Sequence, residues 1–229
     1  SIPLIASSVM SKKIAGGADA IVLDVKVGKG AFMQTLEEAR RLANVMVSIG
    51  KLSGRNVIAV LSPMDQPLGE AVGNALELKE AVELLRGKAP ADYRYHCLHL
   101  AAYMLILGKK ATSMQEALAM AEQTITDGSA MKKLEELISA QNGDTAYIRD
   151  LELLPKASLH RTITASKGGW VKTVDAKEVG ESSVALGAGR SKKGDKIDFG
   201  VGIMVKVKIG EIVAEKQPLF EVHANDEEK

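Results

Sequence analysis

The chain has 229 residues, of which 46% are hydrophobic and 26% charged, an ordinary globular composition with room for one large domain or two modest ones. Basic residues number 30 and acidic residues 29, and no long block of one sign argues for nucleic acid or a membrane surface as partner. Aromatic residues make up 3%, which also argues against stacking on nucleic-acid bases. The single cysteine, Cys97, fits a reducing compartment, and no apolar run is long enough to cross a membrane, so we expect the cytoplasm.

The N-terminal segment reads as a helix followed by a buried strand. We expect residues 1–15 to be helical, with Pro3 in the first turn, where its missing N–H costs nothing. Gly16 and Gly17 end that helix. Ala20–Val27 is a short apolar run with one acid and one base, which predicts a strand covered on both faces.

A second helix and a second strand follow. Thr35 and Glu38 have the spacing of a capping box, and the helix they open should stop at Gly50. Residues 56–61 form another β-branched run. A strand, a helix and a strand joined by short links predict a parallel sheet.

The second half of the chain changes its pattern. Residues 74–140 are almost entirely helical by periodicity, and we expect them to cover one face of the sheet. After Pro155, short β-type runs alternate with glycine turns, which predicts a smaller, mostly β module over 158–229 with Trp170 in its core. Its expected strands are 161–166, 170–174, 183–186, 203–207 and 218–222.

Two short patterns near the N-terminus could carry chemistry. Ser8 and Lys12 stand four residues apart, so they share one face of the first helix. Gly28 and Gly30 allow a tight bend at the carboxyl end of the first strand, where open α/β sheets bind their ligands. From spacing alone, a serine and a lysine on a helix face are usually only solvated. Two glycines without the third of the fingerprint do not indicate a dinucleotide site.

The chain resembles the pyrimidine nucleoside phosphorylases, the family that includes thymidine phosphorylase. The resemblance rests on Ser-Val-Met-Ser-Lys-Lys at 8–13, Asp-Val-Lys-Val-Gly-Lys-Gly-Ala-Phe-Met at 24–33 and Asp-Gln-Pro-Leu-Gly at 65–69, and it continues into the C-terminal part. It implies an α/β fold: a mostly parallel sheet flanked by helices, one helix of a separate helical domain at the N-terminus, and a mostly β (α+β) C-terminal module. The corresponding domains are residues 1–15, 16–157 and 158–229.

The resemblance also implies a reaction, the reversible phosphorolysis of uridine, thymidine or deoxyuridine. Inorganic phosphate is the co-substrate, and the products are the free base and (deoxy)ribose 1-phosphate. Negative charge develops on the leaving base, and the resemblance assigns its stabilisation to Lys12, with Ser8 as a second contact to the base. Ile5, one turn before Ser8, and Phe32, at the end of the glycine bend, would flank the pyrimidine ring; without the family both read as core residues.

A potassium ion is the cofactor that the resemblance implies. It would be held by the backbone oxygens of Leu68 and Ala71 and by the carboxylate of Glu80, since oxygen ligands suit hard cations. Pro63 departs from the family, which usually has an acid or amide before Met-Asp-Gln. The glycine-rich phosphate loop, the other cation ligands, and an arginine and a histidine of the base pocket would precede Ser1. We therefore expect the fragment alone to be inactive. The resemblance also implies that the full-length protein is a homodimer.

Other interpretations stay open. Gly210-Glu-Ile-Val and Pro218-Leu-Phe resemble the sandwich hammerhead of biotinyl and lipoyl carriers, in which Lys177 would be the loosely matching modified residue. Anthranilate phosphoribosyltransferases share the helical and α/β domains but lack the β module. His96 and His99 could share a metal ion, but no second Cys/His pair lies at a suitable spacing, so packed or surface histidines are favoured.

Overall fold

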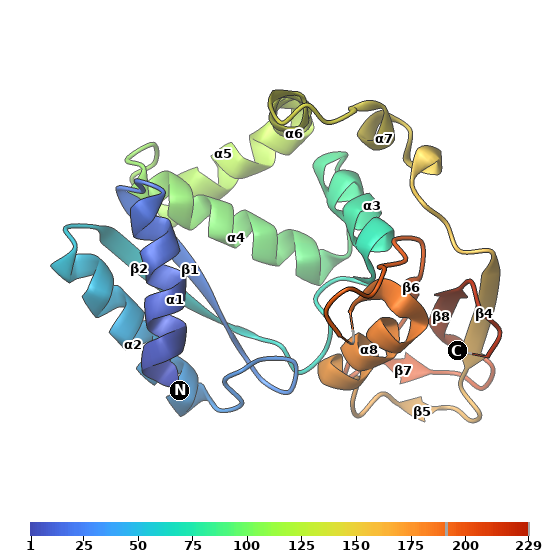
Figure 1. Ribbon diagram of the computed structural model, residues 1–229. Coiled ribbons are helices and arrows are strands. Elements are labelled where there is room, and N and C mark those ends of the chain that lie inside the picture. Colours follow the sequence, from blue (N-terminus) through green and yellow to red (C-terminus); the bar gives the residue numbers. More distant parts are fainter. Residues whose placement is uncertain (191, 229) are drawn as a thin grey trace. The chain divides into compact units, whose positions relative to one another are not determined.

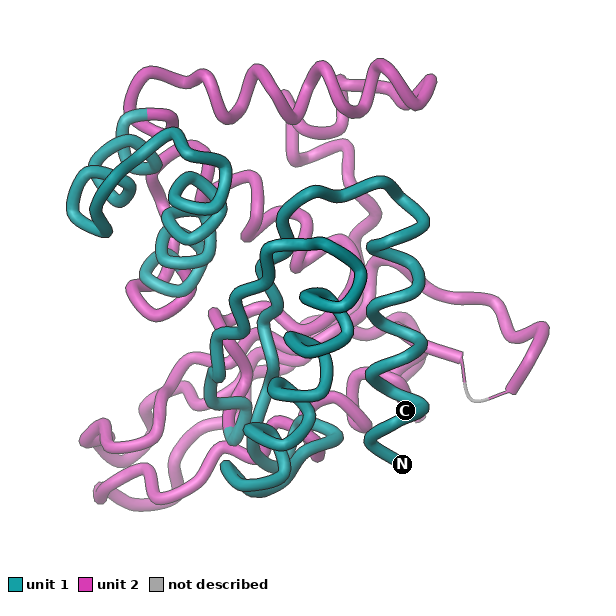
Figure 2. Tube along the Cα trace, turned by 90° about the vertical axis from the view of Figure 1, so that its left-hand side faces the viewer, with its two compact units in different colours: residues 1–65, 94–123 teal, residues 66–93, 124–229 magenta. Residues whose placement is uncertain are grey.

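The computed structural model describes residues 1–190 and 192–228. The chain forms two compact units (Figure 2), whose boundaries differ from those expected after residues 15 and 157. In the described part, no helix is both long and apolar enough to cross a membrane. The first unit is Ser1–Asp65 with Arg94–Gln123, and the second is Gln66–Tyr93 with Thr124–Lys229.

The first unit is built on a two-stranded parallel sheet. β1 (Ala20–Val27) pairs with β2 (Asn56–Pro63) along its whole length. α1 (Ile2–Ala15) packs on α2 (Leu36–Leu52), and α2 lies against both strands (Figure 1). The predicted order of helix, strand, helix and strand and the parallel pairing are therefore confirmed.

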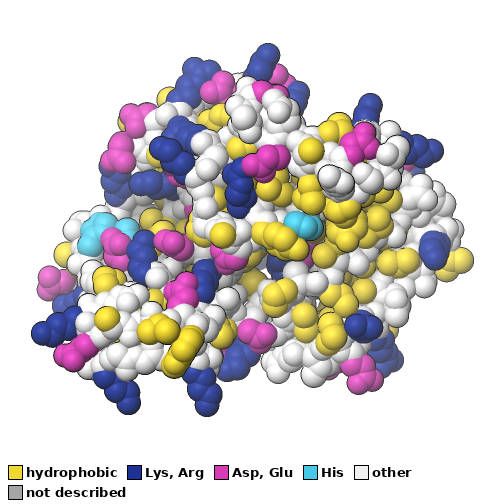
Figure 3. All heavy atoms as spheres, turned by 180° about the vertical axis from the view of Figure 1, so that it is seen from behind, with side chains coloured by type: hydrophobic (Ala, Val, Ile, Leu, Met, Phe, Trp, Pro, Cys, Tyr) yellow, Lys and Arg dark blue, Asp and Glu magenta, His cyan; other side chains and the backbone are white. Residues whose placement is uncertain are grey.

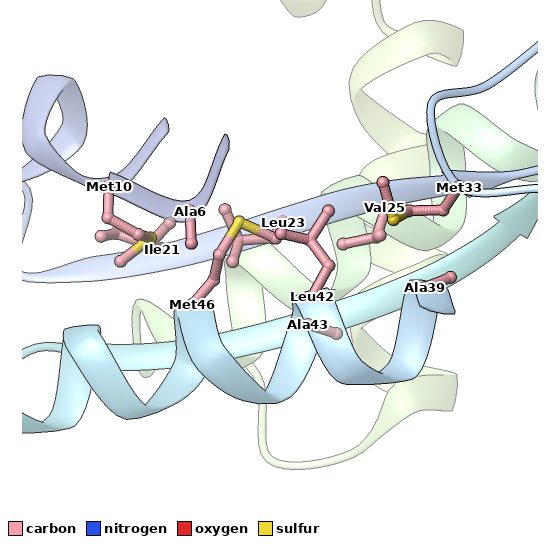
Figure 4. Packing of buried hydrophobic residues seen from close by; sticks show 10 residues of the cluster. All are labelled: Ala6, Met10, Ile21, Leu23, Val25, Met33, Ala39, Leu42, Ala43 and Met46. Carbon is pink, nitrogen blue, oxygen red and sulfur yellow. The ribbon is translucent and has the colours of Figure 1, made fainter. Parts of the chain in front are cut away.

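One apolar core joins α1, β1 and α2. Alternate positions of β1 place Ile21, Leu23 and Val25 in that core, where Ile21 and Leu23 lie beside Met10 and Ala6 of α1 (Figure 4). In the described chain, α1 is thus part of this unit's core, because its apolar stripe finds its partners on β1 and α2. Its place in a separate helical domain stays a prediction. The buried residues that α2 contributes are Ala39, Leu42, Ala43 and Met46.

The end of α2 differs from the expectation that Gly50 stops the helix. The helix runs through Gly50 to Leu52. A Cβ at Gly50 would lie 2.1 Å from Cγ2 of Val57, so this glycine allows α2 and β2 to approach closely. The chain turns instead at Gly54, whose φ of +71° is a conformation that glycine adopts without strain.

The predicted bend after β1 is tightly packed. Gly28 has a φ of +127°, and a Cβ there would lie 2.7 Å from Oδ1 and 2.8 Å from the backbone nitrogen of Asp65. The N–H of Lys29 donates to Oδ1 of Asp65 at 3.2 Å, and the N–H of Gly30 donates to the carbonyl of Met64 at 2.8 Å. The glycine bend and the start of the loop after β2 therefore meet at the carboxyl edge of the sheet.

The second unit contains the predicted β module. Four of its strands form an antiparallel sheet in the order β3–β6–β8–β4, and β5 pairs separately with β7. The sheet includes β3, so it reaches back to a segment far before the expected boundary at 158. The bounds are β3 (Ala71–Val72), β4 (Leu159–Thr164), β5 (Gly169–Trp170), β6 (Gly202–Val205), β7 (Ile212–Val213) and β8 (Pro218–Ala224).

Three expectations for this module were wrong. The run 170–174 was expected to be a strand, but only its first residue belongs to one, β5. The run 183–186 was expected to be a strand, but α8 (Ala176–Ser183) and a π-helical turn (Val184–Ala188) occupy this segment. Asp175 explains the helix, because its side chain caps it by accepting hydrogen bonds from the first backbone N–H groups. Trp170 was expected in the core but is 71% exposed, since smaller residues such as Val201 and Val205 fill that core.

The remaining helices are divided between the two units. The buried side chains of α3 pack with α6 and with Ile148 in the second unit, and the expected covering of the sheet by these two helices stays a prediction. Ala102 of α4 and Ala117 of α5 share a small cluster in the first unit. The bounds are α3 (Asn74–Leu85), α4 (Ala91–Leu107), α5 (Met114–Thr126), α6 (Ser129–Ala140), α7 (Ala146–Arg149) and a 3₁₀ turn (Leu151–Leu153).

The glycine bend predicts a stability effect. Gly28→Ala should lower the free energy of unfolding by about 3 kcal/mol, because the new Cβ adds a clash with Asp65 to a strained φ. Gly54→Ala is the matched control: its φ is also positive, but no atom lies within 4 Å of the new Cβ, so we expect a loss of about 1 kcal/mol. Urea unfolding of both variants measures the difference, and equal losses would contradict the close approach at Gly28.

Candidate functional site

Ser8 and Lys12 share one exposed face of α1, as their spacing predicts. Ser8 and Lys12 are both exposed, and Nζ of Lys12 donates a hydrogen bond to Oγ of Ser8 at 3.5 Å. No described residue forms an ion pair with Lys12, so its ammonium is available to an acceptor on a ligand. Ile5 on the same helix is half-buried and packs against the core of the unit.

The structure does not bring Lys12 to the glycine bend. α1 and β1 run in opposite directions, since Met10 lies beside Ile21 near the start of β1 while Ala6 lies farther along it (Figure 4). Lys12 is therefore near the start of β1, and Gly28 follows its end. The eight residues of β1 separate these ends by roughly 25 Å. Within this unit, the expected meeting of the lysine and the bend is not found.

Phe32 is displayed on the surface of the bend. It is 89% exposed, whereas the next residue, Met33, is buried and forms a bridge to Val27. Phe32 is not a core residue, and it does not belong to the cluster against which Ile5 packs. The two expected walls of the base site are thus in different environments, and their shared role stays a prediction.

A polar cluster on the sheet was missed by sequence reasoning. Asp24 and Lys26, two residues apart on β1, form an ion pair of 2.7 Å. Nε2 of His96 lies 2.6 Å from Asp24 and 3.0 Å from Nζ of Lys26, and Oγ of Ser62 donates to Asp24. Burial alone would raise the pKa of Asp24, but the hydrogen bonds from Lys26, Ser62 and His96 outweigh it and hold that pKa below its usual value.

His96 and His99 do not form a metal-binding pair. His96 turns to Asp24, whereas Nδ1 of His99 lies 2.8 Å from the carbonyl of Tyr95 and its ring packs on the Tyr95 ring with centroids 3.8 Å apart. The interpretation as packed histidines is therefore confirmed for this pair. The acid and base two residues apart on a buried strand were the only local signal of the cluster, because His96 comes from a segment 72 positions after Asp24.

The carboxylate of Glu80 reaches the loop that was expected to hold a cation. It accepts hydrogen bonds from the N–H groups of Glu70 at 2.7 Å and Ala71 at 3.3 Å. Gly69 makes room for it, because a Cβ there would lie 2.4 Å from Oε2 of Glu80. Burial raises the pKa of Glu80, and the two backbone hydrogen bonds oppose that rise only in part.

A lysine binds the same loop and was also missed. Nζ of Lys208 lies 2.8 Å from Oδ2 of Asp92 and donates to the carbonyls of Pro67, at 2.9 Å, and Gly69. Burial would raise the pKa of Asp92, but Lys208 outweighs it and holds that pKa below its usual value. The oxygens of Leu68, Ala71 and Glu80 are the donor type that a potassium ion requires, so the residues present fit this ion.

The carrier interpretation finds no support in the β module. Lys177 stands in the first turn of α8 and lies 3.7 Å from Glu181, so it is a helix residue with a local ion-pair partner. A carrier lysine would lie on an exposed turn between strands.

Comparison with known proteins gives matches along the chain. Residues 1–131 match the glycosyl transferase family α/β domain, and residues 170–229 match the pyrimidine nucleoside phosphorylase C-terminal domain. The pyrimidine-nucleoside phosphorylases of Staphylococcus haemolyticus and Bacillus subtilis are 49% and 48% identical to it over 227 residues, which is 99% of this chain and 52% of each relative. That of Staphylococcus epidermidis is 49% identical over 228 residues.

The chain spans about half the length of the curated relatives it matches. The two domain matches follow one another along the chain, and the identity to these relatives runs through nearly all of it. The chain therefore belongs to the pyrimidine nucleoside phosphorylase family, of which it contains the α/β glycosyl transferase segment and the C-terminal domain.

Proposed function

We propose that this chain works as part of a pyrimidine nucleoside phosphorylase, which converts uridine, thymidine or deoxyuridine and phosphate into free base and (deoxy)ribose 1-phosphate. The observation that carries the proposal is the 49% identity to a pyrimidine-nucleoside phosphorylase over 99% of the chain. The glycosyl transferase domain agrees with pentosyl transfer. The C-terminal domain match argues against an anthranilate phosphoribosyltransferase, which by resemblance lacks that module.

The exposed face of α1 supports a role in binding the base. A pyrimidine offers carbonyl oxygens and a ring N–H, which match the ammonium of Lys12 and the hydroxyl of Ser8. As the glycosidic bond breaks, negative charge grows on the base, and a fixed ammonium stabilises this charge more in the transition state than in the ground state. Ile5, on the same helix, would supply an apolar contact to the ring, whereas Phe32 lies on the glycine bend at the far end of β1 and does not reach a base at Lys12 within this unit.

The phosphate-binding site cannot be the glycine bend if the base binds at Lys12. A base at Lys12 and a phosphate at the glycine bend would lie roughly 25 Å apart in this unit, too far for attack on the sugar carbon. We therefore propose that residues outside this chain hold the phosphate, as the family resemblance implies. A homodimer and a cytoplasmic location are proposals on the same basis, and size-exclusion chromatography of the full-length enzyme tests the first.

Phosphate dependence is the primary test. An enzyme that spans the full length of its relatives should release uracil or thymine from the nucleoside only when phosphate is added, which the change in ultraviolet absorbance measures. Release without phosphate would identify a hydrolase and overturn the proposal. We expect this chain alone to release no base, and turnover by it would mean that the phosphate site lies within residues 1–229.

Lys12 is tested by substitution in the same full-length enzyme. Lys12→Ala should lower kcat/KM by roughly 10²–10³, the usual effect of removing one donor to a developing negative charge. Lys13→Ala is the matched control, because the neighbouring side chain points to a different side of α1, and we expect little change. An effect of Lys12→Ala below about tenfold would remove this residue from the chemistry.

We propose that a potassium ion binds at Leu68, Ala71 and Glu80. The carboxylate of Glu80 lies against the backbone of residues 70 and 71 within the second unit, so it is close enough to this loop to act as a ligand of an ion bound there. Nζ of Lys208 donates hydrogen bonds to the neighbouring carbonyls of Pro67 and Gly69, which are not among the proposed ligands of the ion.

Glu80→Gln in the full-length enzyme tests the potassium site. Potassium chloride should raise the Tm of the parent above its value in sodium chloride of the same ionic strength, because ligand binding stabilises the folded state. Glu80→Gln should weaken this effect by at least about tenfold in potassium concentration. Glu77→Gln, one turn earlier on α3, is the control and should respond as the parent does. Equal potassium responses in all three proteins would place the ion elsewhere.

A further inference from the structure

Two histidines and a glutamate lie together on the sheet of the C-terminal module. His160 on β4 is directly opposite His223 on β8, and Glu221 is two residues before His223. Side chains two residues apart on a strand share a face, so all three project from the same side of the sheet. Figure 3 shows histidine side chains gathered on the surface with acidic side chains beside them.

The distances among these groups are those found around a single metal ion. Nδ1 of His160 lies 3.4 Å from Oε1 of Glu221, and Nε2 of His223 lies 3.2 Å from the same oxygen. Zinc holds nitrogen and oxygen ligands at about 2.0–2.2 Å, so two ligand atoms of a tetrahedral site are separated by about 3.3 Å. The three ligand atoms all lie within 4.8 Å of one another.

Hydrogen bonding prepares the two rings to act as ligands. Nε2 of His160 lies 3.2 Å from the carbonyl of Ala157, which can only accept, so Nε2 donates there and Nδ1 is the ring nitrogen directed at Glu221. Metal-binding histidines are usually oriented in this way by a carbonyl behind the ring. Nε2 of His223 is buried and forms no hydrogen bond in the structure, even with Glu221 close by.

The ordinary alternative is an ion pair between protonated histidine and Glu221. Burial lowers the pKa of His223, and His160 nearby lowers it further, while Glu221 opposes the change only in part. Two ring nitrogens converge on one oxygen of Glu221, an arrangement that fits a single metal ion and that a single ion pair does not require.

We propose that His160, Glu221 and His223 bind one divalent transition-metal ion of the zinc type. Imidazole nitrogens with one carboxylate suit zinc better than potassium or magnesium, which prefer oxygen ligands. His160 is half exposed, so water completes the fourth position. Because the ligands come from two paired strands, the ion would clamp the edge strand β4 to β8 and stabilise the module. None of its three ligands belongs to the proposed potassium loop.

Zinc titration of the chain tests the site. After treatment with a chelator, isothermal titration calorimetry at pH 7.5 should show one Zn²⁺ per chain, and zinc should raise the Tm. His160→Gln, Glu221→Gln and His223→Gln should each weaken binding by at least about 100-fold. His99→Gln, in a histidine that contacts Tyr95 instead, is the control and should bind as the parent does.

The variants separate the proposal from its alternatives. His160 is half exposed on an edge strand, so His160→Gln should fold normally, which circular dichroism verifies even if His223→Gln does not fold. Co²⁺ in place of zinc should give the visible spectrum of a four-coordinate ion, and His160→Gln should abolish it. The proposal is overturned if the parent binds no zinc, or if His160→Gln and Glu221→Gln bind it as tightly as the parent.

Discussion

The apolar stripe that α1 shares with β1 governs what this chain can present to a ligand. Burying a side chain such as Met10 contributes about 1.5–3 kcal/mol, whereas the exposed hydrogen bond between Lys12 and Ser8 contributes less than about 1 kcal/mol. The stripe therefore decides how α1 lies on the sheet, and the polar face is left outside as a consequence. The same contact makes α1 antiparallel to β1, which sets Lys12 apart from the glycine bend.

Local patterns in the sequence predicted those parts of the fold that depend on local forces. The capping box of Thr35 and Glu38 and the parallel pairing of β1 with β2 are both present, because capping and strand propensity act over a few residues. The prediction that Gly50 ends α2 was wrong, because a glycine is needed there for a different reason: Val57 of the next strand packs closely against it. The helix at Ala176–Ser183 has a local signal, Asp175 as its cap, which the glycine-rich surroundings obscured.

The candidate site divides in the same way. The pairing of Ser8 with Lys12 follows from helical geometry and was predictable. Two other contacts join segments that are far apart in the sequence: Asp24 lies 72 positions before His96, and Asp92 lies 116 positions before Lys208. No local sequence pattern predicts such contacts. Burial alone would oppose the charged form of either acid, but Lys208 keeps the pKa of Asp92 low, and Lys26, with Ser62 and His96, does the same for Asp24.

The strand β6 and the segment after it link the two proposed ion sites of the second unit. The N–H of Val205 donates to the carbonyl of Glu70 at 2.7 Å, and Nζ of Lys206 lies 3.2 Å from the Glu70 carboxylate, so this strand fixes the loop that Glu80 serves. On its other side, β6 pairs with β8, which places Gly202 opposite His223 and Met204 opposite Glu221. An ion that clamps β8 to β4 would therefore stiffen the sheet against which the potassium loop is held. The two sites differ in ligand chemistry, nitrogen-rich in one and all oxygen in the other, so each can be loaded without displacing the ion of the other.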